Sequence, residues 1–169
     1  NRIETVSIDD AAGRVLAEDI VATLSTPPFD RAAMDGYAVK AKDTFGSGQF
    51  NPKVLEIAGE VLAGETPKER VGTGQCIQIA TGAMMPRGAD AVVMVEDTEA
   101  ESGRLKVFKA VYPKANVAKK GEDIKAGEPV LKQGALLDAS KIGVLASQGL
   151  NKIRVYEQPK VAILPSGEE

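Results

Sequence analysis

The sequence predicts a mainly β protein with short helices (α+β), in which a β-rich, barrel-like domain is inserted into a smaller mixed α/β domain. Short apolar or alternating runs, separated by Gly, Pro and polar turns, fill the middle of the 169-residue chain. Helix-bearing segments stand at both ends, and the termini of a domain commonly lie close enough together to accept an insertion. We expect the mixed α/β domain at 1–21 and 128–157, the inserted β-rich domain at 22–127, and the start of a further α/β domain at 158–169.

The strands of the β-rich middle are expected from four runs between Val54 and Phe108. These runs are VLEIAGEVLAG, QCIQIA, AVVMV and RLKVF. The glycine pair in VGTGQ (71–75) is expected to form a hairpin turn. The regular spacing of turns between the runs predicts a small barrel or sandwich.

One helix is expected near each end of the chain. Ser7 can cap a short helix over Asp9–Val15, because its hydroxyl can accept from the free amides of the first turn. Asp138 can cap a second helix over Ala139–Gln148, which Gly149 would end. Two further strands are expected after it, KIRVYE (152–157) and KVAILP (160–165).

Composition and charge argue against several classes of protein. The chain has 21 basic and 24 acidic residues and no strongly basic block, so a nucleic-acid partner is not expected. It has neither an apolar run long enough to cross a membrane nor a signal pattern, so we expect a soluble protein. A single cysteine and no histidine argue against a disulfide framework or a zinc site and fit a reducing cytoplasm. Because the chain starts without Met and stops just after an apolar run, we expect it to be part of a longer protein.

The stretch TPPFDRAAMDGYAV (26–39) is the first candidate site, since it places two of only seven aromatic residues beside charges. Asp30 is expected to cap a single helical turn over Arg31–Met34, with Asp35–Gly36 as a turn before a strand at Tyr37–Val39. Two interpretations stay open. Either the acids are turn formers beside core side chains, or they are held near a polyanion or a metal ion.

The second and third candidates are loops that follow strands. In ATGAMMPRGAD (80–90), the Thr81 hydroxyl and the Gly82 amide are donors that an oxyanion could use, with Arg87 as a charged partner. In KKGEDIKAGEPVL (119–131), Glu122 and Asp123 are hard oxygen ligands of the kind that Mg²⁺ takes. The alternatives are a plain β-turn for the first loop and a solvated charged loop for the second.

Taken together, these stretches resemble the molybdopterin molybdenumtransferase family, which comprises MoeA of bacteria and archaea and the E domain of gephyrin. The resemblance is carried by FDRAAMDGYAV, by ATGAMMPRGADAVVMVED and by the spacing on to GEDIKAG, and it runs from DDAAGRVLAEDI to VAILPSGEE. It implies an enzyme of molybdenum cofactor biosynthesis. Such an enzyme takes adenylated molybdopterin, cleaves the adenylate with Mg²⁺ present, and inserts molybdate between the dithiolene sulfurs. Molybdate and tungstate both remain open as the metal, because both are tetrahedral dianions of similar size.

The resemblance also implies functional residues. By their places in the motifs, Asp35 and Asp123 match functional acids, and Thr81 matches a functional hydroxyl. We expect the two acids to position Mg²⁺ or the attacking water, and Thr81 to donate to a phosphate or molybdate oxygen. The substrate-binding candidates are Gly82, Arg87 and Glu169.

Two departures from the family pattern concern the site. Ala32 stands where family members often carry Ser, so a hydroxyl is missing there. The closing SGEE stands where the family usually shows TGDE. Both changes are conservative in kind.

The family also implies partners. Its members are homodimers whose cleft forms between the β-rich domain of one subunit and the pterin-binding domain of the other, which is related to the MogA-type molybdopterin adenylyltransferase. We therefore expect a homodimer, with a MogA-type adenylyltransferase as a functional partner. We also expect this chain to carry only one wall of the active site and to be inactive alone. A different class, a non-catalytic dimerisation and binding module, stays open.

Overall fold

The computed structural model describes residues 2–164 and 167, and the chain divides into two compact units. One unit, here called the terminal unit, combines Asn1–Leu24 with Ile124–Glu169. The other, here called the sheet unit, is Ser25–Asp123. Both ends of the chain thus belong to one unit, and the middle forms the other. No helix among the described residues is long and apolar enough to cross a membrane.

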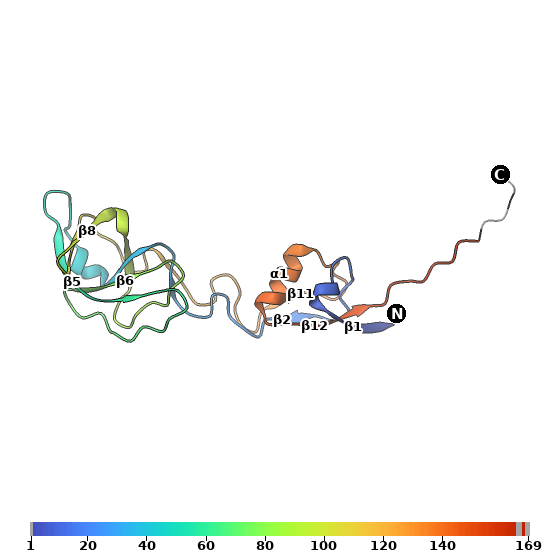
Figure 1. The fold of residues 1–169 in the computed structure, drawn as a ribbon. Helices are drawn as coiled ribbons and strands as arrows, with labels where there is room; N and C mark the ends of the chain where they lie inside the picture. The colour runs from blue at the N-terminus through green and yellow to red at the C-terminus, as the bar shows by residue number, and fades with distance from the viewer. Residues whose placement is uncertain (1, 165–166, 168–169) are drawn as a thin grey trace. The chain divides into compact units, whose positions relative to one another are not determined.

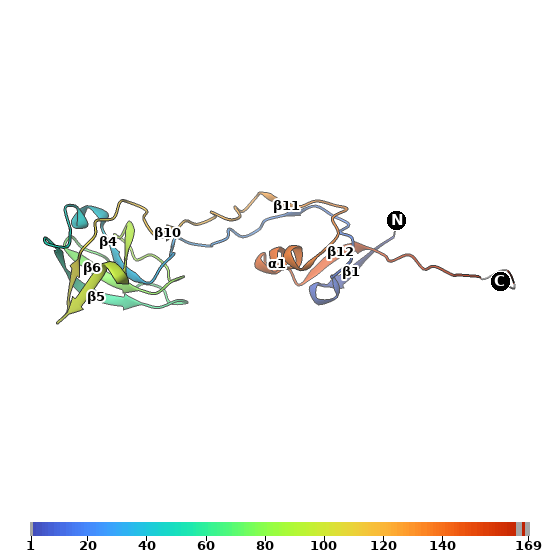
Figure 2. The same cartoon turned by 90° about the horizontal axis from the view of Figure 1, so that it is seen from above.

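The sheet unit is built on a six-stranded sheet with the order β7-β4-β6-β5-β9-β8. Figure 2 shows β4, β6 and β5 side by side. Neighbouring strands are antiparallel except for β5 and β6, which are parallel. The strands are β4 (Gly36–Val39), β5 (Lys53–Val61), β6 (Gln75–Ile79), β7 (Ala91–Met94), β8 (Thr98–Glu101) and β9 (Arg104–Val107).

The prediction of a mainly β fold is confirmed, and each of the four runs expected to be strands contains one. The hairpin expected at VGTGQ (71–75) is wrong. Because β5 and β6 run parallel, the chain between them must cross over rather than turn back, and 71–75 is only the last turn of that crossover.

The core of the sheet unit lies on both faces of the sheet. Successive side chains of a strand point to opposite faces, and on β4 Tyr37 and Val39 pack in one apolar cluster while Ala38 packs in the other. On β7, Val93 belongs to the first cluster and Val92 to the second. All four residues of β4 are therefore buried. The buried strand holds the backbone of the residues that come just before it in the chain.

The terminal unit contains the one α-helix of the described chain and two small antiparallel pairs. In Figure 1 the blue N-terminal strand β1 lies beside the orange-red strand β12. The second pair is β2 with β11. The elements are β1 (Ile3–Ser7), β2 (Ile20–Val21), β11 (Pro129–Leu131), α1 (Ala139–Ser147) and β12 (Lys152–Tyr156).

The predicted C-terminal helix is confirmed together with its cap. Asp138 accepts a hydrogen bond from the Lys141 amide at 2.9 Å, as an N-cap does, and α1 ends one residue before Gln148. Leu145 on this helix is fully buried against Leu16 and Val155. The strand expected at 152–157 is also present, as β12.

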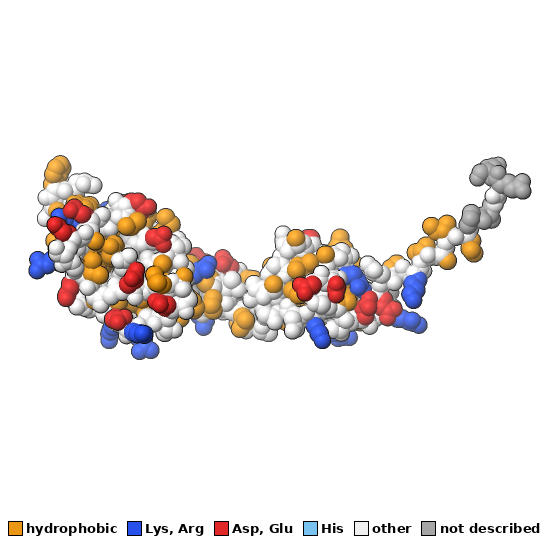
Figure 3. All heavy atoms as spheres, in the orientation of Figure 1, with side chains coloured by type: hydrophobic (Ala, Val, Ile, Leu, Met, Phe, Trp, Pro, Cys, Tyr) orange, Lys and Arg blue, Asp and Glu red, His pale blue; other side chains and the backbone are white. Residues whose placement is uncertain are grey.

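Two elements expected in the terminal unit are wrong. In place of a helix over Asp9–Val15 there is a single 3-10 turn at Ile8–Asp10, because the next residues pair with another segment: Gly13 donates to the Leu137 carbonyl at 2.9 Å. Residues 160–164 form no strand, since no described strand lies beside them to accept their hydrogen bonds. Their apolar side chains are exposed, and Figure 3 shows them in orange along this segment.

Candidate functional site

The residues of the first candidate stretch lie between the other two stretches. Residues 31–32 form a short strand, β3 (Arg31–Ala32), which pairs with β10 (Val117–Ala118). On the other side, Ala32 donates to the Ala83 carbonyl at 3.0 Å and accepts from the Gly82 amide at 2.8 Å. The helical turn expected at Arg31–Met34 is therefore wrong, because backbone pairing on both sides extends this segment.

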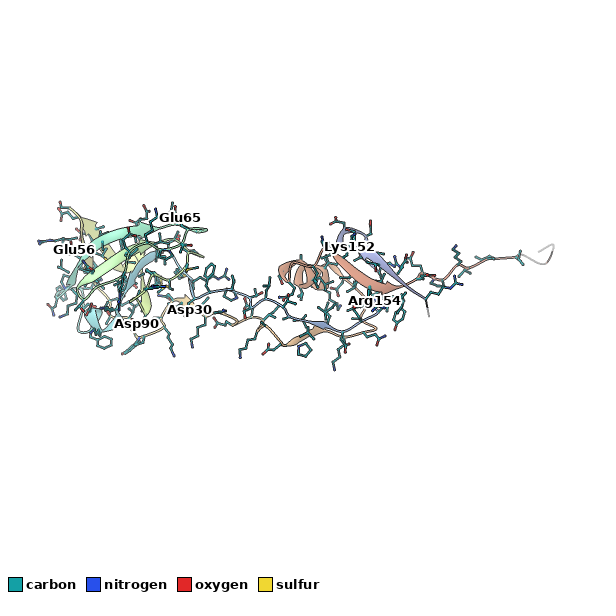
Figure 4. All side chains as sticks on the ribbon, turned by 90° about the horizontal axis from the view of Figure 1, so that it is seen from below. Asp30, Glu56, Glu65, Asp90, Lys152 and Arg154 are labelled. Atoms are coloured by element: carbon teal, nitrogen blue, oxygen red, sulfur yellow. The ribbon has the colours of Figure 1, made fainter. Side chains whose placement is uncertain are left out.

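Asp30 joins the first stretch to the third. Its carboxylate accepts a hydrogen bond from the Lys120 amide at 2.8 Å, while its carbonyl accepts one from Met85 at 2.9 Å. Figure 4 labels Asp30 where the chain enters the sheet unit. The expected role of Asp30 as the cap of a helical turn over Arg31–Met34 is therefore wrong, because its carboxylate accepts from the 119–122 turn instead.

Asp35 and Thr81 form the contact that joins the first stretch to the second. One carboxylate oxygen of Asp35 accepts from the Thr81 amide at 2.7 Å and from the Thr81 hydroxyl at 2.8 Å. These two hydrogen bonds hold the pKa of Asp35 below its usual value, and the one from the Thr81 amide has the larger effect. Desolvation has a smaller effect in the opposite direction. Oδ2 has no hydrogen-bond partner among the described residues. Asp35 is therefore an anchored carboxylate that is ionised at neutral pH.

Gly36 fixes the backbone beside Asp35. A Cβ on Gly36 would lie 1.9 Å from the Val93 carbonyl oxygen, far inside van der Waals contact. Only glycine lets β4 lie this close to β7 at that point. The MDG sequence thus places the acid immediately before Gly36, the residue where a buried strand begins.

A cavity of about 200 Å³ opens beside Asp35. A polar row lines it, because Tyr37 is paired with Gln78 and Gln78 with Glu60 across three neighbouring strands. Leu62 and Val95 supply apolar lining. No sequence motif marks Glu60 and Gln78, since only the parallel register of β5 and β6 places them together.

The other predicted site residues have different positions. The Gly82 amide is already used by the Ala32 carbonyl, so it is not the free donor we expected. Arg87 lines a different cavity from Asp35. Asp123 donates its amide to the Thr26 carbonyl at 3.0 Å, and its exposed side chain does not line the Asp35 cavity. Glu169 lies outside the described residues.

Comparison with known proteins identifies the family. The family model described as the MoeA N-terminal region (domain I and II) matches residues 1–149. A molybdopterin molybdenumtransferase of Staphylococcus epidermidis is 37% identical over 97% of this chain and 39% of its own length. A putative molybdopterin biosynthesis protein of Methanocaldococcus jannaschii is 40% identical over 99% of this chain and 40% of its own.

A solved structure agrees with these matches. The crystal structure of the molybdopterin biosynthesis MoeA protein from Pyrococcus horikoshii OT3 superimposes with a TM-score of 0.88 at 45% identity, over 91% of this chain and 41% of that one. The chain thus spans about two fifths of the length of the relatives it matches. By these matches, the chain belongs to the family of MoeA N-terminal regions, which comprise domains I and II.

Proposed function

We propose that this chain is the N-terminal part of an enzyme of molybdenum cofactor biosynthesis, one that cleaves the adenylate of adenylated molybdopterin and inserts molybdate. The names of the relatives support the pathway. The observation that carries the proposal is the anchored carboxylate of Asp35 at the edge of a cavity, held by Thr81. The family resemblance implies that Asp35 and Thr81 are both functional residues.

In this proposal Asp35 acts as an anion and not as a proton acceptor. A general base works best when its pKa lies near the working pH, and the pKa of Asp35 is held below even its ordinary value. A carboxylate that is ionised at neutral pH and has one oxygen without a hydrogen bond is suited to orienting a water molecule or a cation. Thr81 uses both of its donors on Asp35, so we assign it to positioning that carboxylate rather than to binding phosphate directly.

The acids beside this cavity fit Mg²⁺. Among the described residues there is no cluster of three or more acidic, His or Cys ligands. Mg²⁺ needs none, because it commonly takes one or two carboxylates and completes its shell with water and substrate phosphate. Asp35 and Glu60 line the same cavity and would be those carboxylates. Asp123 lies outside this cavity and is a candidate only through the family resemblance. Bound there, Mg²⁺ would supply charge neutralisation at the phosphate.

The proposal includes two partners. We propose a homodimer, in which the partner subunit completes the site, and a MogA-type adenylyltransferase that supplies the adenylated substrate. The alternative function is a non-catalytic dimerisation and binding module.

The experiment that separates the two functions is an assay of cofactor formation from adenylated molybdopterin, molybdate and Mg²⁺. The full-length protein should form cofactor, and the 169-residue chain alone should form none. Replacing Asp123 by Asn in the full-length protein should lower the rate and leave the melting temperature close to that of the wild type. A full-length protein without activity that still dimerises would support the binding module instead.

A further inference from the structure

A second cavity of the sheet unit is lined by three cations. It has a volume of about 340 Å³ and is formed by residues 66–70, which belong to the crossover from β5 to β6, and by residues 84, 85 and 87. Lys68, Arg70 and Arg87 contribute the positive charges, and Glu69 is the one acid among the lining residues. No lining residue is shared with the Asp35 cavity.

The three cations have no carboxylate partner. None of Lys68, Arg70 and Arg87 forms an ion pair among the described residues. Elsewhere in the sheet unit, cations near acids do pair: Lys106 lies 3.2 Å from Glu99. Figure 3 shows charges of both signs mixed over the visible surface, whereas the lining of this cavity carries three cations and one acid.

The two arginines are held on backbone segments that are fixed to each other. The Val71 amide donates to the Arg87 carbonyl at 2.9 Å. The next residue, Gly88, has a φ of +91°, and a Cβ there would lie 2.5 Å from the Val71 carbonyl oxygen and 3.3 Å from Cγ of Arg70. The stem of Arg70 therefore lies directly against the backbone that carries Arg87.

The neighbours of the cations leave a net positive site. Met85 packs against the apolar cluster of the sheet, which anchors that side of the cavity. The Glu69 carboxylate lies 3.5 Å from the position that a Cβ of Gly59 would take on β5, and it makes no ion pair with the cations. The lining itself carries three positive charges against one negative charge, and Lys68 and Glu69 also line a neighbouring cavity that contains Glu60 and Glu65.

We propose that this cavity binds a tetrahedral oxyanion of the phosphate type through Lys68, Arg70 and Arg87. A guanidinium offers parallel N–H donors that match two oxygens of such an anion, and an ammonium adds a further donor and charge. Inorganic phosphate, the phosphate of a nucleotide monoester, and molybdate share this chemistry. The proposal does not depend on the function assigned to Asp35, because the two cavities share no lining residue.

The test is titration calorimetry of the 169-residue chain with sodium phosphate, sodium molybdate and adenosine monophosphate, each at the same chloride ionic strength. We expect saturable binding of at least one anion at one site per chain, and the anion that binds most tightly identifies the source. The double variant K68Q/R87Q should weaken that binding about tenfold or more, because two charge-assisted hydrogen bonds are lost.

The matched control is K42Q/R104Q, which removes one lysine and one arginine from exposed positions of the same unit that do not line this cavity. It should bind within about twofold of the wild type. If K68Q/R87Q melts at a lower temperature, Arg70→Lys replaces it, since that change keeps the charge but removes the guanidinium fork and should still weaken binding. An absence of saturable binding of all three anions would overturn the proposal, as would an equal loss in the control.

Discussion

Asp35 receives both hydrogen bonds from Thr81 on the same carboxylate oxygen, one from the amide at 2.7 Å and one from the hydroxyl at 2.8 Å. The two residues belong to strand ends that are far apart in the sequence and meet because β4 and β6 are paired. This arrangement orients the acid and leaves Oδ2 for another ligand. It also ties the ionisation of the acid to a single neighbour.

Removing the hydroxyl of Thr81 should raise the pKa of Asp35 toward its ordinary value. Thr81→Val keeps the branched shape of the side chain and the hydrogen bond from the Thr81 amide, which has the larger effect on the pKa. The pKa of Asp35 should therefore rise only part of the way to its ordinary value. Thr81→Ser keeps the hydroxyl and serves as the control. The measurement is an NMR titration of the Asp35 carboxyl in the three proteins, and an unchanged pKa in the Val variant would contradict the role given to the hydroxyl.

The lowered pKa of Asp35 also predicts how its contribution to stability depends on pH. Because the folded protein holds this pKa below the ordinary value of 3.8, the contribution is fully present above that value and is lost as pH falls through the folded pKa. Unfolding midpoints of the wild type and Asp35→Asn should therefore converge as the pH is lowered below 3.8. A difference between the two midpoints that stays constant from neutral to acid pH would show that the charge of Asp35 does not stabilise the folded protein.

Gly36→Ala should destabilise the sheet unit by about 3 kcal/mol, because the added Cβ meets the Val93 carbonyl oxygen and the buried backbone on both sides must shift. Gly48→Ala is the control, since a Cβ at Gly48 meets nothing within 4 Å and should cost less than about 1 kcal/mol. Denaturant unfolding measures both changes. Equal effects would contradict the close approach of β4 and β7.

Asp30→Ala should loosen the 119–123 loop without unfolding the sheet. The Lys120 amide loses its acceptor and should exchange its hydrogen with solvent faster, while amides of β4 should keep their protection. Asp30→Asn retains an acceptor oxygen and should restore most of the protection of Lys120. Hydrogen exchange followed residue by residue by NMR checks this, and equal exchange in the Ala and wild-type proteins would contradict the capping role.

The sequence predicted the local features of the fold more reliably than the long-range ones. The alternation in the runs that became β5, β6, β7 and β9 comes from burial on a pleated sheet, and so it can be seen in the sequence. The cap at Asp138 is equally local. The expected helix over Asp9–Val15 was wrong because pairing with a segment more than 100 residues away determines its structure.

The same distinction holds for the site. Asp35 and Thr81 were found through their motifs, but their contact was not, since it depends on the pairing of β4 with β6. Glu60 and Gln78 have no motif and reach the cavity only through the parallel register of β5 and β6. Residues with a local signature are therefore recoverable from this sequence, whereas residues defined by strand register are not.

The rate of cofactor formation by Asp35→Asn in the full-length protein tests the central claim most directly. Asn can keep both hydrogen bonds from Thr81 but loses the charge, so the melting temperature should stay close to that of the wild type while the rate falls by about 100-fold or more. Asp43→Asn is the matched control, because Asp43 also accepts a backbone hydrogen bond, from Gly74 at 2.8 Å, but lies outside the Asp35 cavity. Its rate should be unchanged. An Asp35→Asn protein that forms cofactor at the wild-type rate would contradict the account.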